Sequence, residues 1–84
     1  MERTAEEFVH ELPNGRWFVG DFVRTSPEGQ AIFLIELRTD AVAIELSIEQ
    51  VARATSTVRT YSIKSSAKRA AQRMIERVLD EDRR

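Results

Sequence analysis

The clearest hydrophobic pattern in the chain lies in its C-terminal stretch, from Ser65 to Asp82. Apolar residues recur there at positions i, i+3, i+4, i+7, i+8, i+11 and i+12, the spacing of one face of an α-helix. They are Ala67, Ala70, Ala71, Met74, Ile75, Val78 and Leu79. The pattern predicts a long amphipathic helix that buries this stripe against the rest of the domain.

A shorter stripe with the same spacing lies near the N-terminus. Its apolar residues are Ala5, Phe8, Val9 and Leu12. Thr4 followed three residues later by Glu7 is the sequence pattern of a capping box, and residues 13–15 form a Pro-Asn-Gly stop. These signals predict a short helix over residues 5–12.

The segments between the two stripes are typical of β-strands, because they are rich in β-branched and aromatic residues and are separated by turn residues. The predicted strands are 16–25, 30–38, 41–46 and 55–63. Residues 31–35 form an unbroken apolar run, which predicts a central strand covered on both faces. The alternation of the first strand is interrupted at Gly20 and Asp21, which predicts a bulge or an edge there.

A second capping-box pattern, Ser47-Ile48-Glu49-Gln50, follows the third predicted strand. It predicts a short helix over residues 48–54, with a continuation of the strand as the alternative. Together the elements predict one α+β domain. It has an antiparallel sheet of three to four strands, a short N-terminal helix and a long C-terminal amphipathic helix packed on one face. Helices are expected on that face only.

Length and composition limit the class of protein. A chain of 84 residues is expected to form a single domain with a thin margin of stability, which a partner or a second copy would increase. It has no cysteine, so disulfide bonds and thiol catalysis are excluded. No apolar run approaches the length of a membrane span, and the first residues do not resemble a secretion signal. We therefore expect a cytoplasmic protein with no membrane contact.

Charge is unevenly distributed along the chain, although the net charge is only -1. Residues 1–52 contain ten acidic residues and four arginines, whereas residues 53–84 contain nine basic residues and four acidic ones. Either the two halves neutralise each other, or the basic half presents a face to an acidic partner.

The basic residues of the C-terminal half recur on the polar side of the predicted helix and just before it. They are Arg59, Lys64, Lys68, Arg69, Arg73 and Arg77. Arg69, Arg73 and Arg77 are spaced by four, and like charges at this spacing destabilise a helix. Cations near the start of the helix and acids near its end also oppose the helix dipole. We infer that either the acidic half of the chain or an external anionic surface compensates this arrangement.

Candidate catalytic residues are few. His10 is the one histidine and stands near Glu7 and Glu11, where it could act as a general base or a metal ligand. We interpret it instead as a solvated surface residue. The sequence has no phosphate-binding glycine loop, nucleophile elbow or zinc-binding helix motif. We expect no enzymatic activity and no cofactor or metal.

Three aromatic residues lie close together in the first predicted strand. Trp17, Phe18 and Phe22 could form a stacking platform for bases or a binding hot spot for a protein, although filling the core is the simpler interpretation. Neighbouring residues of a strand point to opposite faces, so either Trp17 or Phe18 is expected near the surface.

Two short segments resemble known nucleic-acid-binding families. Residues 66–71, Ser-Ala-Lys-Arg-Ala-Ala, resemble the start of the second helix of the double-stranded-RNA-binding domain. That resemblance implies phosphate contacts from Lys64 and Lys68. However, Ser65 and Ser66 stand where the family has paired lysines. Residues 47–54 resemble the first helix of a helix-turn-helix motif, without its usual glycine-containing turn. We take neither as membership of the family.

These observations predict a small non-enzymatic interaction module that binds a protein partner. A regulatory subunit, or a compact inhibitor of the kind encoded by phages and mobile elements, would have this size and charge. The alternative is a nucleic-acid-binding domain that uses the basic face of the C-terminal helix, and self-association into a homodimer is also compatible. The predicted contact residues are Arg59, Lys64, Lys68, Arg69, Arg73, Arg77 and Trp17.

Overall fold

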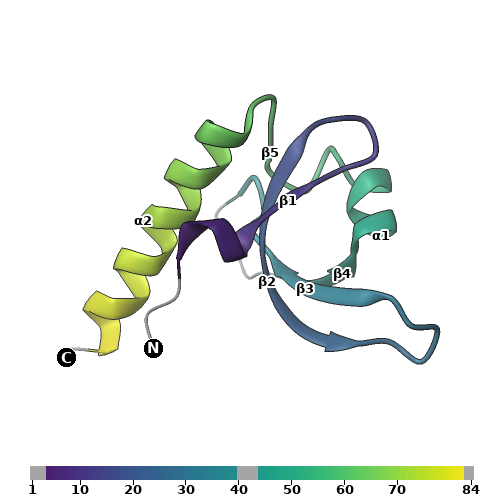
Figure 1. The fold of residues 1–84 in the computed structure, drawn as a ribbon, viewed down its shortest axis with the longest axis horizontal. Helices are drawn as coiled ribbons and strands as arrows, with labels where there is room; N and C mark the ends of the chain where they lie inside the picture. The colour runs from purple at the N-terminus through teal and green to yellow at the C-terminus, as the bar shows by residue number, and fades with distance from the viewer. Residues whose placement is uncertain (1–3, 40–43, 83–84) are drawn as a thin grey trace.

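A twisted antiparallel sheet forms the centre of the α+β fold in this computed structural model (Figure 1). The structure describes residues 4–39 and 44–82, with side chains up to residue 77. The elements are η1 (Ala5–Phe8), β1 (Val9–Glu11), β2 (Trp17–Thr25), β3 (Ala31–Ile35), β4 (Ile44–Ser47), α1 (Ile48–Arg53), β5 (Thr60–Tyr61) and α2 (Lys64–Asp82). Four strands lie in the order β1-β2-β3-β4, and β5 pairs with β2. The predicted fold class is confirmed.

The long strand β2 organises the sheet. Its first residues lie between β1 and β5, where Phe18 is opposite both His10 and Thr60. From Gly20 onward it pairs with β3. Of the two alternatives predicted at Gly20-Asp21, the bulge is wrong in position, because the register shifts between Phe22 and Arg24. The edge is the better description, because pairing with β1 ends at Val19 and β2 pairs only with β3 from Gly20 onward among the described strands. Gly20 itself remains regularly paired.

Two hydrophobic cores lie on opposite faces of this strand. The inner core consists of Leu12, Phe18, Phe33, Ile35, Leu37, Val51 and Val58. The outer core consists of Phe8, Val9, Val19, Ala67, Ala70 and Ala71. Because successive residues of a strand point to opposite faces, Phe18 enters the inner core and its neighbour Val19 enters the outer core. The strand β2 therefore separates the two cores and contributes side chains to both.

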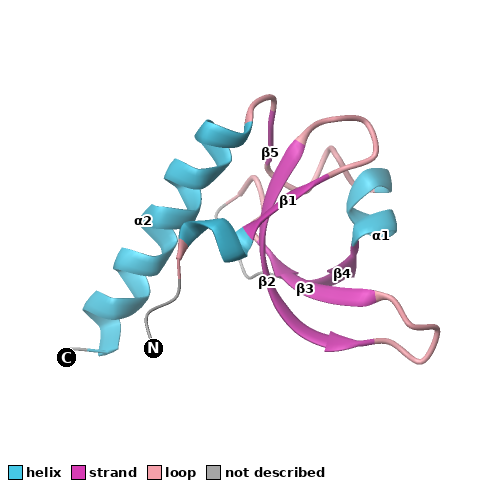
Figure 2. Ribbon diagram, viewed as in Figure 1, coloured by secondary structure: helices cyan, strands magenta, loops and turns pink. Residues whose placement is uncertain are grey.

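The helices cover these two cores from opposite sides (Figure 2). The first five residues of the predicted stripe of α2 pack on the sheet with η1, with Ala67, Ala70 and Ala71 buried and Met74 and Ile75 half-buried. The side chains of the other two, at positions 78 and 79, lie outside the described part. This confirms a long amphipathic helix on one face, beginning at Lys64 rather than Ser65. The prediction that helices lie on that face only is wrong, because α1 covers the inner core with Val51.

The N-terminal segment differs from the helix predicted over residues 5–12. A single 3-10 turn ends at Phe8, and Val9–Glu11 form β1 instead. Thr4 makes no side-chain capping bond. The helical spacing would place Val9 and Leu12 on one face, whereas the fold sends Val9 to the outer core and Leu12 to the inner core. Pairing with β2 makes this division possible, because a strand can present its residues to both faces.

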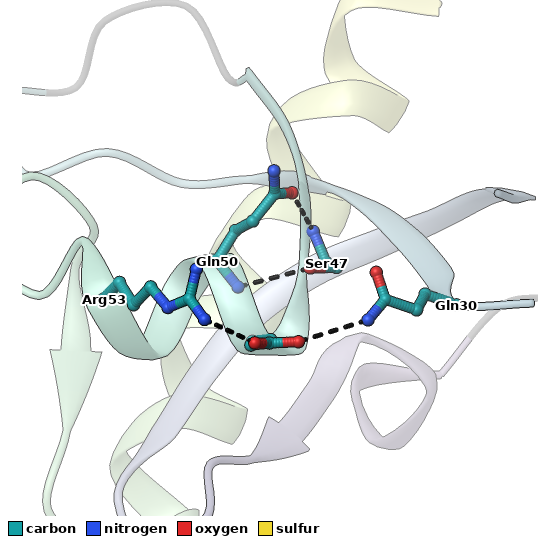
Figure 3. A network of polar contacts seen from close by, with 5 residues as sticks. Gln30, Ser47, Gln50 and Arg53 are labelled. Atoms are coloured by element: carbon teal, nitrogen blue, oxygen red, sulfur yellow. Dashed lines mark hydrogen bonds and ion pairs between the residues drawn. The ribbon is translucent and has the colours of Figure 1, made fainter. Parts of the chain in front are cut away.

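The second capping box forms as predicted and resolves the alternative in favour of a helix (Figure 3). The Ser47 amide donates to Gln50 Oε1 at 2.9 Å, and the Gln50 amide donates to Ser47 Oγ at 3.2 Å. Glu49 accepts hydrogen bonds from Arg53 at 2.5 Å and from Gln30 at 3.3 Å. Ser47 is thus both the last residue of β4 and the N-cap residue of α1.

The strand predicted over residues 55–63 is much shorter than expected. After α1, the amides of Thr57 and Val58 donate to the Ala54 carbonyl oxygen at 3.0 and 2.9 Å, which forms a turn. Only a bridge from Val58 to Leu37 and the two residues of β5 pair as a sheet. The first three residues of the third predicted strand, 41–43, lie outside the described residues.

Candidate functional site

Five of the six basic residues predicted as a contact surface lie on α2, where they are divided between two flanks. At 100° per residue, positions 64 and 68 lie roughly 100° to 180° around the helix from positions 69, 73 and 77. The apolar stripe on the sheet side lies between the two sets. The predicted residues therefore do not form one continuous surface.

On the flank beside η1, both lysines bind one carboxylate of the N-terminal half. Lys64 Nζ pairs with Glu6 Oε1, and Lys68 Nζ lies 3.3 Å from Glu6 Oε2. Hydrogen bonds from the two lysines lower the pKa of the Glu6 carboxyl. Lys64 Nζ also lies 5.5 Å from the centre of the Trp17 ring. Both lysines are therefore paired within the chain, although they share the single negative charge of Glu6.

Arg59 is also neutralised internally, on the side of β5. Its Nε lies 3.1 Å from Glu36 Oε1, and its Nη2 donates to the Arg38 carbonyl oxygen at 2.8 Å. The Tyr61 hydroxyl donates to the same Glu36 oxygen at 3.2 Å. Burial, followed by the charge of Glu36, raises the pKa of Tyr61 to about 12, although Arg59 and Arg73 act in the opposite direction. This network joins β5 to the segment after β3.

Arg69, Arg73 and Arg77 differ from the other three basic residues. All three are exposed, and no ion pair links them to any other residue among those whose side chains the structure describes, 4–39 and 44–77. At 1.5 Å per residue they span about 12 Å of the helix axis. We call them the arginine column. Arg73 stands on the side of β5, since its charge influences the pKa of Tyr61.

Sequence reasoning identified the basic residues but not the acidic residues that bind them. The charge difference between the halves of the chain indicates internal neutralisation, and Glu6 and Glu36 provide part of it. No local motif marks these two carboxylates among the ten acidic residues of the first half. Their roles depend on η1 lying beside α2 and on β5 lying beside the end of β3.

The aromatic residues of β2 divide as the strand geometry predicts. Phe18 is fully buried in the inner core, whereas Trp17 is half-buried beside the outer core. Phe22 is 52% exposed and its ring meets Phe33 edge-on at 6.1 Å. The three rings therefore do not form a common stacking platform.

His10 is not the solvated surface residue that the sequence predicts. It is half-buried on β1, with its ring centre 4.4 Å from that of Phe33 and 5.3 Å from that of Phe18. Its Nε2 lies at hydrogen-bond distance, 3.1 Å, from the Gly20 carbonyl oxygen. The strand conformation places the ring over the aromatic residues, where a helix would have turned it to solvent.

We expect the stability of the domain to fall as the pH is lowered below the ordinary pKa of histidine. Burial lowers the pKa of His10, against a smaller opposing effect of the bond to Gly20. The unfolded chain then binds a proton at a higher pH than the folded chain does, so stability is lost as pH falls through about 6.5. Urea unfolding at steps from about pH 7.5 to pH 5.5 measures this slope. A slope that is unchanged in His10→Gln would contradict the assignment.

Within the described part of the chain, no cluster of three or more histidine, aspartate or glutamate residues could hold a metal ion. Over the same residues, no helix combines the length and apolar character needed to cross a membrane.

Comparisons with protein-family models, with curated proteins and with solved structures found no match to this chain.

Proposed function

We propose that this protein is a small binding module whose arginine column contacts an acidic surface of a protein partner. The observation that supports the proposal is the difference between the two sets of basic residues. Lys64 and Lys68 share the Glu6 carboxylate and Arg59 pairs with Glu36, whereas the three arginines of the column have no ion pair among the residues whose side chains are described.

An external anion would compensate an arrangement that is unfavourable for the helix. Like charges four residues apart destabilise a helix by about 0.2 to 0.5 kcal/mol per pair. The column contains two such pairs, Arg69 with Arg73 and Arg73 with Arg77. A partner that supplies carboxylates at this face would convert the repulsion into attraction.

A protein partner fits the charge distribution better than nucleic acid does. Binding to nucleic acid depends on neutralising many phosphates. Three of the six predicted contact cations are already paired with Glu6 or Glu36, and the whole chain has a net charge of -1. Nucleic-acid binding through the column is the competing outcome of the test. A regulatory subunit or a compact inhibitor would act through such a contact without catalytic chemistry of its own.

Affinity capture with the full chain tests the proposal. From a lysate of the source organism, used both with and without nuclease treatment, we expect the wild type to retain a partner protein in both cases. The triple variant Arg69→Gln, Arg73→Gln, Arg77→Gln should capture roughly tenfold less of that protein, because the loss of each exposed ion pair with the partner is expected to weaken binding about two- to fourfold. Quantitative mass spectrometry measures this ratio, and circular dichroism checks that both chains are folded.

The matched control replaces the two lysines of the opposite flank, Lys64→Gln with Lys68→Gln. Because both lysines are already paired with Glu6 and lie on the other flank of the helix, the control should retain the partner. Recovery of the same protein by the triple variant, or retention of nucleic acid alone, would contradict the proposal.

A further inference from the structure

We infer that the part of the partner that binds the arginine column is a flexible acidic segment, a run of aspartate and glutamate in extended conformation. This inference rests on the proposed function and specifies its partner. Three features of the surface support it: the surroundings of the column, its spacing, and the positions of the aromatic residues.

The exposed surface around the column is polar. Gln72 and Glu76, which lie between the two flanks of α2, are exposed and hydrogen-bonded to each other. Most of the exposed large apolar side chains in the described residues lie on β2, β3 and β4, and they are Phe22, Val23, Leu34 and Ile44. The remaining one, Ile63, precedes the first turn of α2, six residues before Arg69.

A stable interface between two folded surfaces is centred on buried aromatic or aliphatic anchors and covers more than about 1,000 Å². The column provides three cations and no apolar anchor. The β2-β3 hairpin, which carries Phe22 and Val23, extends away from α2 and cannot serve as that centre (Figure 1). A ligand that needs only charge contacts is the better match, and runs of acidic residues in flexible segments have this property.

The spacing of the column matches an extended peptide. Consecutive arginines rise about 6 Å along the helix axis. Side chains on one face of an extended chain recur at about 6.6 to 6.8 Å, since each residue adds 3.3 to 3.4 Å. Alternate carboxylates of an acidic run can therefore meet Arg69, Arg73 and Arg77 in turn, each through the bidentate geometry that guanidinium groups favour.

A single-stranded nucleic acid is a poorer match to the same column. Such strands gain much of their affinity from bases stacked on aromatic side chains. Tyr61 is half-buried with its hydroxyl bonded to Glu36. Trp17 lies beneath Lys64 and pairs in register with Tyr61 in the sheet. Both rings are thus half-buried and already in contact with other residues, which leaves neither as an open platform for a stacked base.

Fluorescence anisotropy with three labelled probes tests the inference on the full chain. The probes are a short peptide of alternating glutamate and aspartate, the same peptide with glutamine and asparagine, and an oligothymidine of equal length. Of the three probes, we expect only the acidic peptide to bind well. Its affinity should fall as the salt concentration rises from about 20 to about 150 mM. The triple glutamine variant of the column should lose roughly tenfold in affinity, and the Lys64→Gln, Lys68→Gln control should change less than about twofold.

Two results would overturn the inference. The first is an acidic peptide that does not bind, or that binds the triple variant as tightly as the wild type. The second is tighter binding of oligothymidine through the same three arginines, which would assign the column to nucleic acid. If the peptide fails but the captured partner is still lost in the triple variant, the proposed function stands and the partner presents a folded surface.

Discussion

Replacing Phe18 with alanine is expected to lower the free energy of unfolding by about 3 to 5 kcal/mol, because it removes a fully buried aromatic ring and leaves a cavity. Phe18 is 0% exposed and packs edge-on against Phe33 at 5.7 Å. At about 0.05 to 0.15 kcal/mol per residue, the whole stability of a domain of 84 residues is about 4 to 13 kcal/mol, so the variant loses a large part of it. Urea unfolding followed by circular dichroism should therefore show a midpoint at a much lower urea concentration than that of the wild type.

Phe22→Ala is the matched control for this prediction. Phe22 also packs edge-on against the Phe33 ring, but it is 52% exposed. Its removal should cost about 1 kcal/mol or less, since most of the ring is already in water. Phe18→Leu supplies an intermediate variant that keeps the stability measurable. Similar losses for the two alanine variants would show that the inner core is not where the structure places it.

Gly20→Ala is expected to cost about 1 to 3 kcal/mol through overpacking. A Cβ atom at this position would lie 2.8 Å from Ile35 Cδ1, 3.0 Å from Phe18 Cε2 and 3.1 Å from Phe33 Cβ. All three neighbours belong to the inner core, which leaves them little freedom to move. Thermal unfolding of the purified variant measures the loss, and Gly20→Val should be less stable again.

Gly29→Ala separates this steric effect from a general intolerance of alanine at glycine positions. Gly29 has a positive φ of 85°, but a Cβ atom there would meet no other atom within 4 Å. Its substitution should cost about 1 to 2 kcal/mol of backbone strain. Enlarging the side chain further at Gly29 should add much less than it does at Gly20. Wild-type stability in Gly20→Ala would rule out the close packing described here.

The parts of the fold that the sequence predicts well are those that local physics determines. The stripe of α2 is one example, because three small residues, Ala67, Ala70 and Ala71, recur at helical spacing and become buried together. The capping box of Ser47 and Gln50 is another, since its hydrogen bonds join residues three apart in the chain. Such signals need no knowledge of the distant parts of the chain.

The N-terminal segment shows where this reasoning fails. Phe8, Val9 and Leu12 have helical spacing, and nothing within residues 5–12 indicates a strand partner. The partner is β2, and its pairing with Val9–Glu11 overrides the local pattern. The same error caused the wrong prediction for His10, because a helix and a strand direct that ring to different surroundings.

The sequence predicts which basic residues belong to the candidate site, but it does not predict which of them form ion pairs within the fold. The six basic residues, and the excess of acidic residues in the other half of the chain, can be read directly from the sequence. Which cations remain unpaired depends on tertiary contacts, since Glu6 reaches α2 only because η1 packs beside it. The arginine column emerges only after those pairs are assigned.

The division of the hydrophobic residues into two cores has a consequence for synthesis on the ribosome. Every residue of the inner core lies between Leu12 and Val58, so the chain carries all of them before α2 has been translated. The outer core instead joins Phe8, Val9 and Val19 to alanines of α2. Because domains can begin to fold during synthesis, the inner core can condense first. Phe8, Val9 and Val19 then lack the cover of α2 until that last helix leaves the exit tunnel, and in this interval the nascent chain is most open to aggregation or to binding by a chaperone.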